Sequence, residues 1–340
     1  PQMTLRTDTL QFDREKQLLY YRYSATIRDS INTLTSDTGN YYLAQNKFQA
    51  ISDVVLTNPD YVLNSNHLDY YTDSGRAFLY GESTIRSDDN LIFCKKGFYD
   101  TKTDVSYFTR DARIEFDNKE IMADSLYYNR NLGFASANKN IVIIDTLNNS
   151  VLKGHYAEFF EKVDSAFVVG RAVAITNTNK DSLFIHGDTI LATGKPEERI
   201  IRCYHHVKFF KSDMSGKCDS IHSNQGTGLT QMFVNPILWS DGSQITGDTI
   251  QLINDTKEDR LDSLKVLYNS FIINKDSMGY NQIKGRNLYG KFEDNDLRFV
   301  NIVGNGEIIH YVRDEAQELI GIEHRMLYFI KTLKYVHLLT

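Results

Sequence analysis

The residue types most capable of chemistry are gathered in one short stretch of the sequence. Cys203, His205, His206, Cys218 and His222 offer thiol and imidazole groups, which are the usual ligands of zinc. Their spacing matches no tetrahedral zinc motif, so we predict that no metal binds here. We expect two free, partly buried thiols instead, and a disulfide between the two cysteines stays open as an alternative.

Aspartate recurs at one position of a repeated phrase, which raises a second possibility, carboxylate chemistry. The clearest copy reads Ile121-Met122-Ala123-Asp124-Ser125-Leu126-Tyr127-Tyr128. Calcium-binding β-rolls need Gly-Gly-x-Gly-x-Asp tandems, which the sequence lacks. Aspartate often caps a turn with its own side chain, and we expect this role for Asp8, Asp124, Asp188, Asp219 and Asp248. No nucleophile-elbow, Walker or dinucleotide motif occurs, so the sequence predicts neither an enzyme nor a cofactor.

The composition predicts a folded, acidic protein. Hydrophobic residues make up 41% of the 340, with 21 tyrosines and 19 phenylalanines, which is ample for a core. The formal net charge is −6, so a nucleic-acid partner is not expected, because phosphate binding needs a basic face. No uncharged apolar run approaches the roughly 20 residues that span a bilayer. The chain starts at Pro1, which leaves open whether a signal peptide was removed.

The repeated phrase defines a ten-fold repeat. Its anchor position is occupied by Asp8, Asp37, Asn66, Lys95, Asp124, His155, Asp188, Asp219, Asp248 and Arg286. The first five anchors lie 29 residues apart, and later intervals vary. The residue before the anchor is always small, and the residue three before it is Leu or Ile in every unit except at Gly216. Small residues at one recurring position predict a corner with close backbone approach.

Apolar and polar residues alternate on both sides of the anchor. Counted from the anchor, position +2 is mostly Leu or Ile, and position +4 is Phe or Tyr in the first six units. The alternation resumes at +11, +13, +17 and +19 after a polar turn such as residues 71–75. A period of two is typical of a strand with one apolar face, so we expect positions +2 and +4 to lie inside.

These patterns predict an all-β fold, an elongated β-jellyroll made of a folded-over antiparallel sheet with about ten units of 29 residues. Two polar turns per unit favour strands that run out and back, and a parallel β-helix is the alternative. Regular units 1 to 5 occupy residues 1–150, and less regular units continue through residues 151–312. Residues 313–340 are a C-terminal tail of unknown structure, whose end (326–340) caps the solenoid or contacts a membrane surface.

The repeated Leu/Ile-x-small-Asp-x-Leu-x-aromatic units resemble the OstA-like (organic solvent tolerance) family. The stretches Met-Phe-Val-Asn-Pro-Ile-Leu-Trp (232–239) and Gln-Ile-Thr-Gly-Asp-Thr-Ile (244–250) strengthen the likeness, which covers residues 5 to about 310. The resemblance implies a periplasmic protein of a Gram-negative cell that bridges lipopolysaccharide transport to the outer membrane. It also implies partners, namely the lipid A acyl chains of lipopolysaccharide, other transport proteins through edge-strand pairing, and further copies joined head to tail.

The resemblance places the acyl chains against the inner columns of the repeat. An apolar trough holds such chains without any catalytic group, because each buried methylene contributes about 0.8 kcal/mol. The candidate lining residues are Leu10, Phe12, Tyr41, Leu68, Tyr70, Tyr99, Leu126, Tyr128, Phe159, Ile190, Ile221 and Ile250. For the aromatic column, a packed core ladder that fixes the register is the alternative. A β-solenoid scaffold without lipid, and less favourably a polysaccharide-processing enzyme, stay open as other functions.

Overall fold

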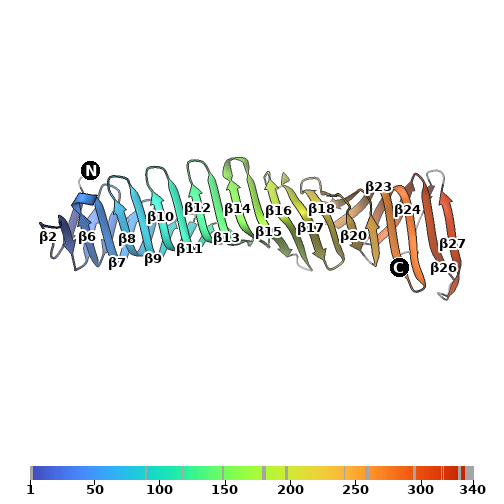
Figure 1. The fold of residues 1–340 in the computed structure, drawn as a ribbon, viewed down its shortest axis with the longest axis horizontal. Coiled ribbons are helices and arrows are strands. Elements are labelled where there is room, and N and C mark those ends of the chain that lie inside the picture. The colour runs from blue at the N-terminus through green and yellow to red at the C-terminus, as the bar shows by residue number, and fades with distance from the viewer. Residues whose placement is uncertain are drawn as a thin grey trace. The chain divides into compact units, whose positions relative to one another are not determined.

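The computed structural model describes residues 3–88, 90–116, 118–147, 149–177, 181–195, 198–240, 242–256, 260–293, 296–314, 316, 318–327 and 331–333. They form two compact units, residues 1–162 and 163–340. Both units consist of antiparallel strands, and helical structure in the described residues is confined to short 3-10 turns such as η1 (Leu43–Gln45) (Figure 1). No helix in the described part of the chain is long and apolar enough to cross a membrane.

The first unit begins with short strands and continues with long ones. Its strands are β1 (Thr4–Thr7), β2 (Gln11–Asp13), β3 (Leu18–Tyr21), β4 (Ala25–Arg28), β5 (Thr33–Ser36), β6 (Thr38–Tyr42), β7 (Lys47–Asn58), β8 (Tyr61–Tyr71), β9 (Arg76–Ser87), β10 (Asn90–Asp100), β11 (Val105–Phe116), β12 (Lys119–Asn129), β13 (Phe134–Asp145) and β14 (Ser150–Phe160). From β7 to β14 each strand pairs with the next one, always antiparallel. This confirms the antiparallel sheet and excludes the parallel β-helix.

The second unit repeats this plan with more interrupted strands. They are β15 (Ser165–Asn177), β16 (Ser182–Thr193), β17 (Ile200–Lys211), β18 (Met214–Asn224), β19 (Leu229–Phe233), β20 (Ile237–Ser240), β21 (Ser243–Thr246), β22 (Thr249–Asp255), β23 (Arg260–Asp276), β24 (Gly279–Glu293), β25 (Asp296–Val303), β26 (Gly306–Arg313), β27 (Leu319–Leu327) and β28 (Lys331–Leu333). Strand β18 pairs with both β19 and β20, because the chain bends at Val234 and Asn235, where φ is positive. Pro236 follows, and it lacks the N–H needed to continue a ladder.

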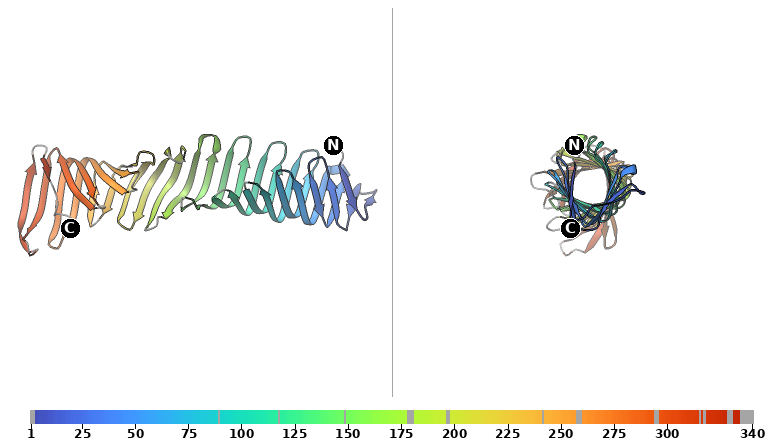
Figure 2. Two further views of the ribbon diagram at one scale, coloured as in Figure 1. Left: turned by 180° about the vertical axis from the view of Figure 1, so that it is seen from behind. Right: turned by 90° about the vertical axis from the view of Figure 1, so that its left-hand side faces the viewer.

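Each long strand bends in its middle. The pairing register shifts there, for example between Ile51 and Val54 on β7. Two consecutive residues with positive φ lie at the bend of β7, β11, β13, β15, β17 and β23, such as Arg110 with Asp111 and Lys139 with Asn140. The end-on view in Figure 2 shows the strands of the first unit curling, so that each has an inner and an outer face. The small residue before each anchor lies at this bend, as the sequence predicts.

The tail predicted at residues 313–340 is described only in part. Strand β27 pairs antiparallel with β26, and β28 pairs with β25. Residues 328–330 and 334–340 lie outside the described residues, so the interpretation of the segment 326–340 as a cap or a membrane contact stays a prediction.

Candidate functional site: the inner face of the sheet

The inner face of the first unit is built from straight rows of side chains that run across the strands. One row, here called the central row, passes beside the bend and consists of Tyr21, Gly39, Ala50, Leu68, Leu79, Gly97, Phe108, Leu126, Ala137 and Ala157. All of them are buried. The second unit has the same row, which includes Ile190, Cys203, Ile221 and Ile250. The central row is therefore a packed core in each unit.

The bends divide the strands into two halves, here called the arms of the sheet. A second inner row lies on the same arm as the central row, farther from the bend. This tyrosine row consists of Tyr41, Phe48, Tyr70, Ala77, Tyr99, Ser106, Tyr128, Ala135 and Phe159. From Tyr70 onward, aromatic side chains on even-numbered strands alternate with Ala or Ser on odd-numbered strands. The four tyrosines are half-buried, and Phe159 is 42% exposed. Burial therefore decreases from the bend toward the hairpin tips.

The opposite arm presents a purely aliphatic inner row. This aliphatic row consists of Leu34, Leu56, Leu63, Ile85, Ile92, Ile114, Ile121, Ile143 and Leu152. Most of its members beyond Leu63 are half-buried rather than buried. One inner wall is therefore lined with phenol rings and the other with branched aliphatic side chains.

Tyrosines from the two arms influence each other. Burial raises the pKa of Tyr61, which lies at the far end of β8, and the charge of Tyr70 on the same strand adds to this effect. Burial also raises the pKa of Tyr99, as do its hydrogen bond to Asp104 Oδ1 at 2.8 Å and the nearby charge of Tyr61. Tyr61 and Tyr99 therefore lie close enough for the charge of one to raise the pKa of the other.

The predicted lining residues divide into three groups by burial. Leu68, Leu126, Ile190, Ile221 and Ile250 are at most 5% exposed and belong to the central rows. Tyr41, Tyr70, Tyr99 and Tyr128 are half-buried in the tyrosine row. Leu10, Phe12 and Phe159 are exposed, at 49%, 52% and 42%. Leu10 precedes β2, and Phe12 lies on β2 at the start of the unit, where few strands surround it.

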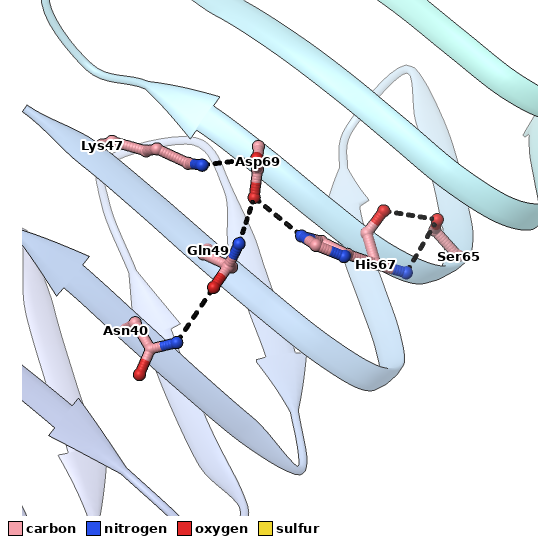
Figure 3. Close-up of polar contacts among 6 residues, drawn as sticks. All are labelled: Asn40, Lys47, Gln49, Ser65, His67 and Asp69. Carbon is pink, nitrogen blue, oxygen red and sulfur yellow. Dashed lines mark hydrogen bonds and ion pairs between the residues drawn. The ribbon is translucent and has the colours of Figure 1, made fainter.

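Sequence reasoning missed an ion-pair cluster on the outer face of the first unit (Figure 3). Asp69, only 6% exposed, lies 2.6 Å from Lys47 Nζ and 2.7 Å from His67 Nε2, and it accepts a hydrogen bond from Gln49 Nε2 at 3.0 Å. These partners hold the pKa of Asp69 below its usual range although burial opposes the shift, and Asp69 in turn raises the pKa of Lys47. The alternation pattern places Asp69 outside, but no sequence signal reveals its partners.

The predicted role of the anchor aspartates is wrong for four of the five. Their side chains do not cap their own turns but accept hydrogen bonds from the positive-φ residues of the neighbouring strand. Asp124 accepts from Asn140 Nδ2 at 3.0 Å, and Asp248 accepts from Asn269 Nδ2 at 3.0 Å. Asp188 and Asp219 contact His206 and His205, with distances of 3.0 and 3.4 Å to Nδ1. The aspartates therefore join adjacent bends to one another.

The residues considered as zinc ligands are separated by the sheet. Cys203 and Cys218 are buried on the inner face as free thiols, whereas His205 and His206 lie exposed at a bend. His222 packs against Tyr204 and Phe233 on the outer face. Within the described residues, no group of three or more His, Cys, Asp or Glu side chains could hold a metal ion.

The fold is thus an antiparallel jellyroll whose repeats place apolar side chains along the inside of each unit. Residues 1–66 match the family model of the OstA-like protein, so the N-terminal part of the chain is similar to that family, as the sequence resemblance also indicates. A similar solved structure is LptH, the LptA homologous periplasmic component of the conserved lipopolysaccharide transport device from Pseudomonas aeruginosa. It is 16% identical with a TM-score of 0.30, and the match covers 32% of this chain and 82% of that one. A search of curated protein sequences found no match.

Proposed function

We propose that the inner face of the sheet binds the acyl chains of lipopolysaccharide and that the protein is a periplasmic bridge in the transport of this lipid to the outer membrane. The observation that carries the proposal is the alternation in the tyrosine row. Aromatic rings on every second strand stand about 9.5 Å apart, since neighbouring strands are about 4.8 Å apart. Small side chains such as Ala77 and Ala135 lie between them. We infer that acyl chains lie over these small residues, facing the aliphatic row.

Binding of this kind needs no catalytic group. Burial of a methylene contributes about 0.8 kcal/mol, so a chain of ten or more methylenes gains substantially from contact with apolar walls. The central row supplies the rigid floor, because its side chains are already fully packed. The phenol hydroxyls on one wall offer hydrogen bonds near the more exposed side of the inner face.

The test uses neighbouring tyrosines that face opposite ways on β12. Tyr128 belongs to the inner tyrosine row, whereas Tyr127 lies on the outer face against Phe134, with ring centroids 6.1 Å apart. Both are half-buried, so a photo-crosslinking benzoylphenylalanine replaces either one with similar disturbance. Leu68 and Leu126 are unsuitable because they are almost completely buried.

Crosslinking in cells that produce lipopolysaccharide should trap the lipid from position 128 and not from position 127. Tyr70 and Tyr71 on β8 provide a second matched pair of inner and outer positions. Equal crosslinking from both faces, or none from either, would reject lipid binding at the inner face. A purely structural scaffold would then be the better function, and the fully packed central row favours that second candidate.

We further propose that edge strands connect the chain to its partners. Among the described residues, β1 pairs only with β4, and β27 pairs only with β26, so each has one edge without a ladder partner. Exposed edges of this kind accept another strand by β-augmentation. A proline in place of Arg6 or Gly321 should weaken head-to-tail self-association or association with other transport proteins, as measured by sedimentation. Unchanged association with both variants would show that these edges are not the contacts.

A further inference from the structure

The outer face of the second unit carries two adjoining hollows near the hairpin tips. Their volumes are about 540 and 420 Å³, and both are lined by Phe210, Ser215 and Trp239. These three residues lie in one row across β17, β18 and β20, with Phe210 opposite Ser215 and Ser215 opposite Trp239. Trp239 ends the Pro-Ile-Leu-Trp segment of the sequence, and its side chain lies on the outer face, whereas that of Leu238 is buried inside. We call the two hollows together the rim groove.

The small side chain of Ser215 explains why the rim groove is open. Phe210 and Trp239 are two strands apart, which corresponds to about 9.5 Å, and the serine between them leaves that space unfilled. The two aromatic side chains stay 58% and 37% exposed. Tyr280, which is 52% exposed, extends the aromatic lining into the larger hollow. Two aromatic faces separated in this way fit a flat ring or sugar between them.

The indole ring of Trp239 is held in a fixed orientation. Its Nε1 donates a hydrogen bond to Gln244 Oε1 at 3.0 Å, and Lys217 Nζ lies 5.9 Å from the ring centroid. A ring positioned before ligand arrives loses little conformational freedom on binding. Among the described residues, Gln244 Nε2 donates no hydrogen bond, so it is available to a polar ligand.

The rim groove is basic although the whole chain has a net charge of −6. Lys208 and Lys217 line the smaller hollow, and Lys275 lines the larger one. None of these three lysines forms an ion pair within the described part of the chain, whereas Lys211 lies 3.3 Å from Asp213. Unpaired lysines beside exposed aromatic faces attract a ligand that combines an anion with a stackable ring.

The strand pairing argues against an extended peptide as this ligand. Strands β17, β18, β20, β21, β23 and β24 are paired in sequence through the groove, so no free edge is present for strand addition. Hydroxyl and amide groups at the tips, including Ser240 and Gln244, match the hydroxyl groups of a sugar instead.

We propose that the rim groove binds an acidic saccharide, with a sugar ring against Trp239 and Phe210 and its phosphate or carboxylate on Lys208 and Lys217, which lie opposite each other on β17 and β18. This site lies on the outer face, so it does not depend on lipid binding inside. A phosphorylated sugar and a uronic acid both supply such an anion, and separate probes distinguish the two.

Trp239 is the only tryptophan in the chain, so its fluorescence reports on this groove alone. The purified full chain is titrated with glucose 6-phosphate and with tetragalacturonate, and glucose and inorganic phosphate serve as the uncharged and ring-free controls. At least one anionic saccharide should shift the emission and protect Trp239 from acrylamide quenching. Replacing Lys208 or Lys217 by Ala should weaken that binding about tenfold. Lys153→Ala, which removes an exposed outer-face lysine of the first unit, should leave it unchanged.

Several results would overturn the proposal. They are equal binding of glucose, equal binding of phosphate alone, and affinity that is unaffected by both lysine substitutions. Binding of an acidic, phenylalanine-containing peptide with no binding of either saccharide would assign the groove to a protein partner. Calorimetry repeats each titration without relying on fluorescence, and absence of heat there together with unchanged emission would also reject the site. Circular dichroism verifies that each variant is folded.

Discussion

The ring of Tyr21 occupies the space beside Gly39 on the neighbouring strand. A β-carbon added at Gly39 would lie 2.4 Å from that ring, and Tyr21 is only 2% exposed. The tyrosine hydroxyl oxygen reaches across the bend to Ser36 Oγ at 2.6 Å. The same pairing of a glycine with a large neighbour recurs at Gly97 with Leu79 and at Gly216 with Phe209. Glycines that interrupt the apolar inner rows are therefore part of the inner packing.

Replacing Gly39 by Ala should destabilise the first unit by about 1–3 kcal/mol, because the buried ring has to move. Denaturant unfolding followed by circular dichroism measures this loss. Gly321→Ala is the matched control, since no atom lies within 4 Å of its added β-carbon. Equal stability of the Gly39→Ala variant and the parent chain would contradict the packing described for Tyr21.

The Asp69 cluster should make stability depend on acid pH. The pKa of Asp69 is lower in the folded chain than the value of about 3.9 expected when unfolded. Its ion pairs therefore stabilise the fold fully above that unfolded value, and this contribution is lost as the pH falls through the lower folded pKa. We expect the free energy of unfolding to decrease from about pH 4 downward, as measured by urea unfolding at several pH values.

Asp69→Asn should cost about 3 kcal/mol near neutral pH, because Lys47 would remain partly buried without its carboxylate partner. The variant should also lose part of the acid dependence. Lys95 and Asp111 provide the control, since this pair is largely exposed and its disruption should cost much less stability. An Asp69→Asn variant with the parent's acid profile would show that other carboxylates control it.

The three cysteines should be unreactive in the folded chain. Burial raises the pKa of Cys203 and of Cys218 to about 12, and that of Cys94 to about 11. At pH 8 almost no thiolate is present, and the side chains are shielded from reagents. Ellman's reagent should therefore label no thiol at pH 8 until denaturant is added, and then label all three. Fewer than three thiols after unfolding would reveal a disulfide between Cys203 and Cys218.

The positive-φ bend at Asn140 should tolerate glycine better than valine. Asn140 has a φ of 50°, and its side chain donates to Asp124 on the neighbouring strand. A β-branched residue is disfavoured in this conformation, so Asn140→Val should destabilise the unit by about 1–2 kcal/mol more than Asn140→Gly. Thermal unfolding of the two variants measures the difference. Greater stability of the valine variant would indicate that the bend relaxes to another conformation.

The repeat in the sequence predicted much of this fold, because each position of the repeat has similar surroundings in successive units. The alternation of apolar and polar residues was enough to place Leu68 and Leu126 inside, and the small residue before each anchor could be placed at the bend. The sequence could not show that Gly39 and Gly97 face large neighbours, since the pairing of rows depends on the register between strands. Nor could it show that Asp124 bonds to Asn140, because both the register shift and the positive φ at that bend arise from tertiary pairing.

The candidate site was less predictable than the fold. The alternating pattern identified Tyr70 and Tyr128 as inner residues but assigned Phe12 the same role, although it lies exposed near the beginning of the chain. Repeat patterns do not reveal that β2 pairs with β3 alone among the described strands. The rim groove was hidden because Trp239 is well separated from Phe210 and Ser215 in the sequence and meets them only through strand pairing.

Because each strand bends at a fixed position, a hairpin can change its length without changing the direction in which the side chains of the strands point. In the unit that begins at Asp124, the extra residues lie between the strand ends Asp145 and Ser150, whereas the longest unit lengthens β23 to 17 residues. Side chains change faces with every inserted residue, so an insertion within an arm would turn its apolar row outward. At a hairpin tip, the same insertion leaves both flanking strands in phase. The hairpin tips can therefore vary in length and acquire new binding residues. The inner surface is preserved as long as the number of residues between the bend and each apolar row stays the same.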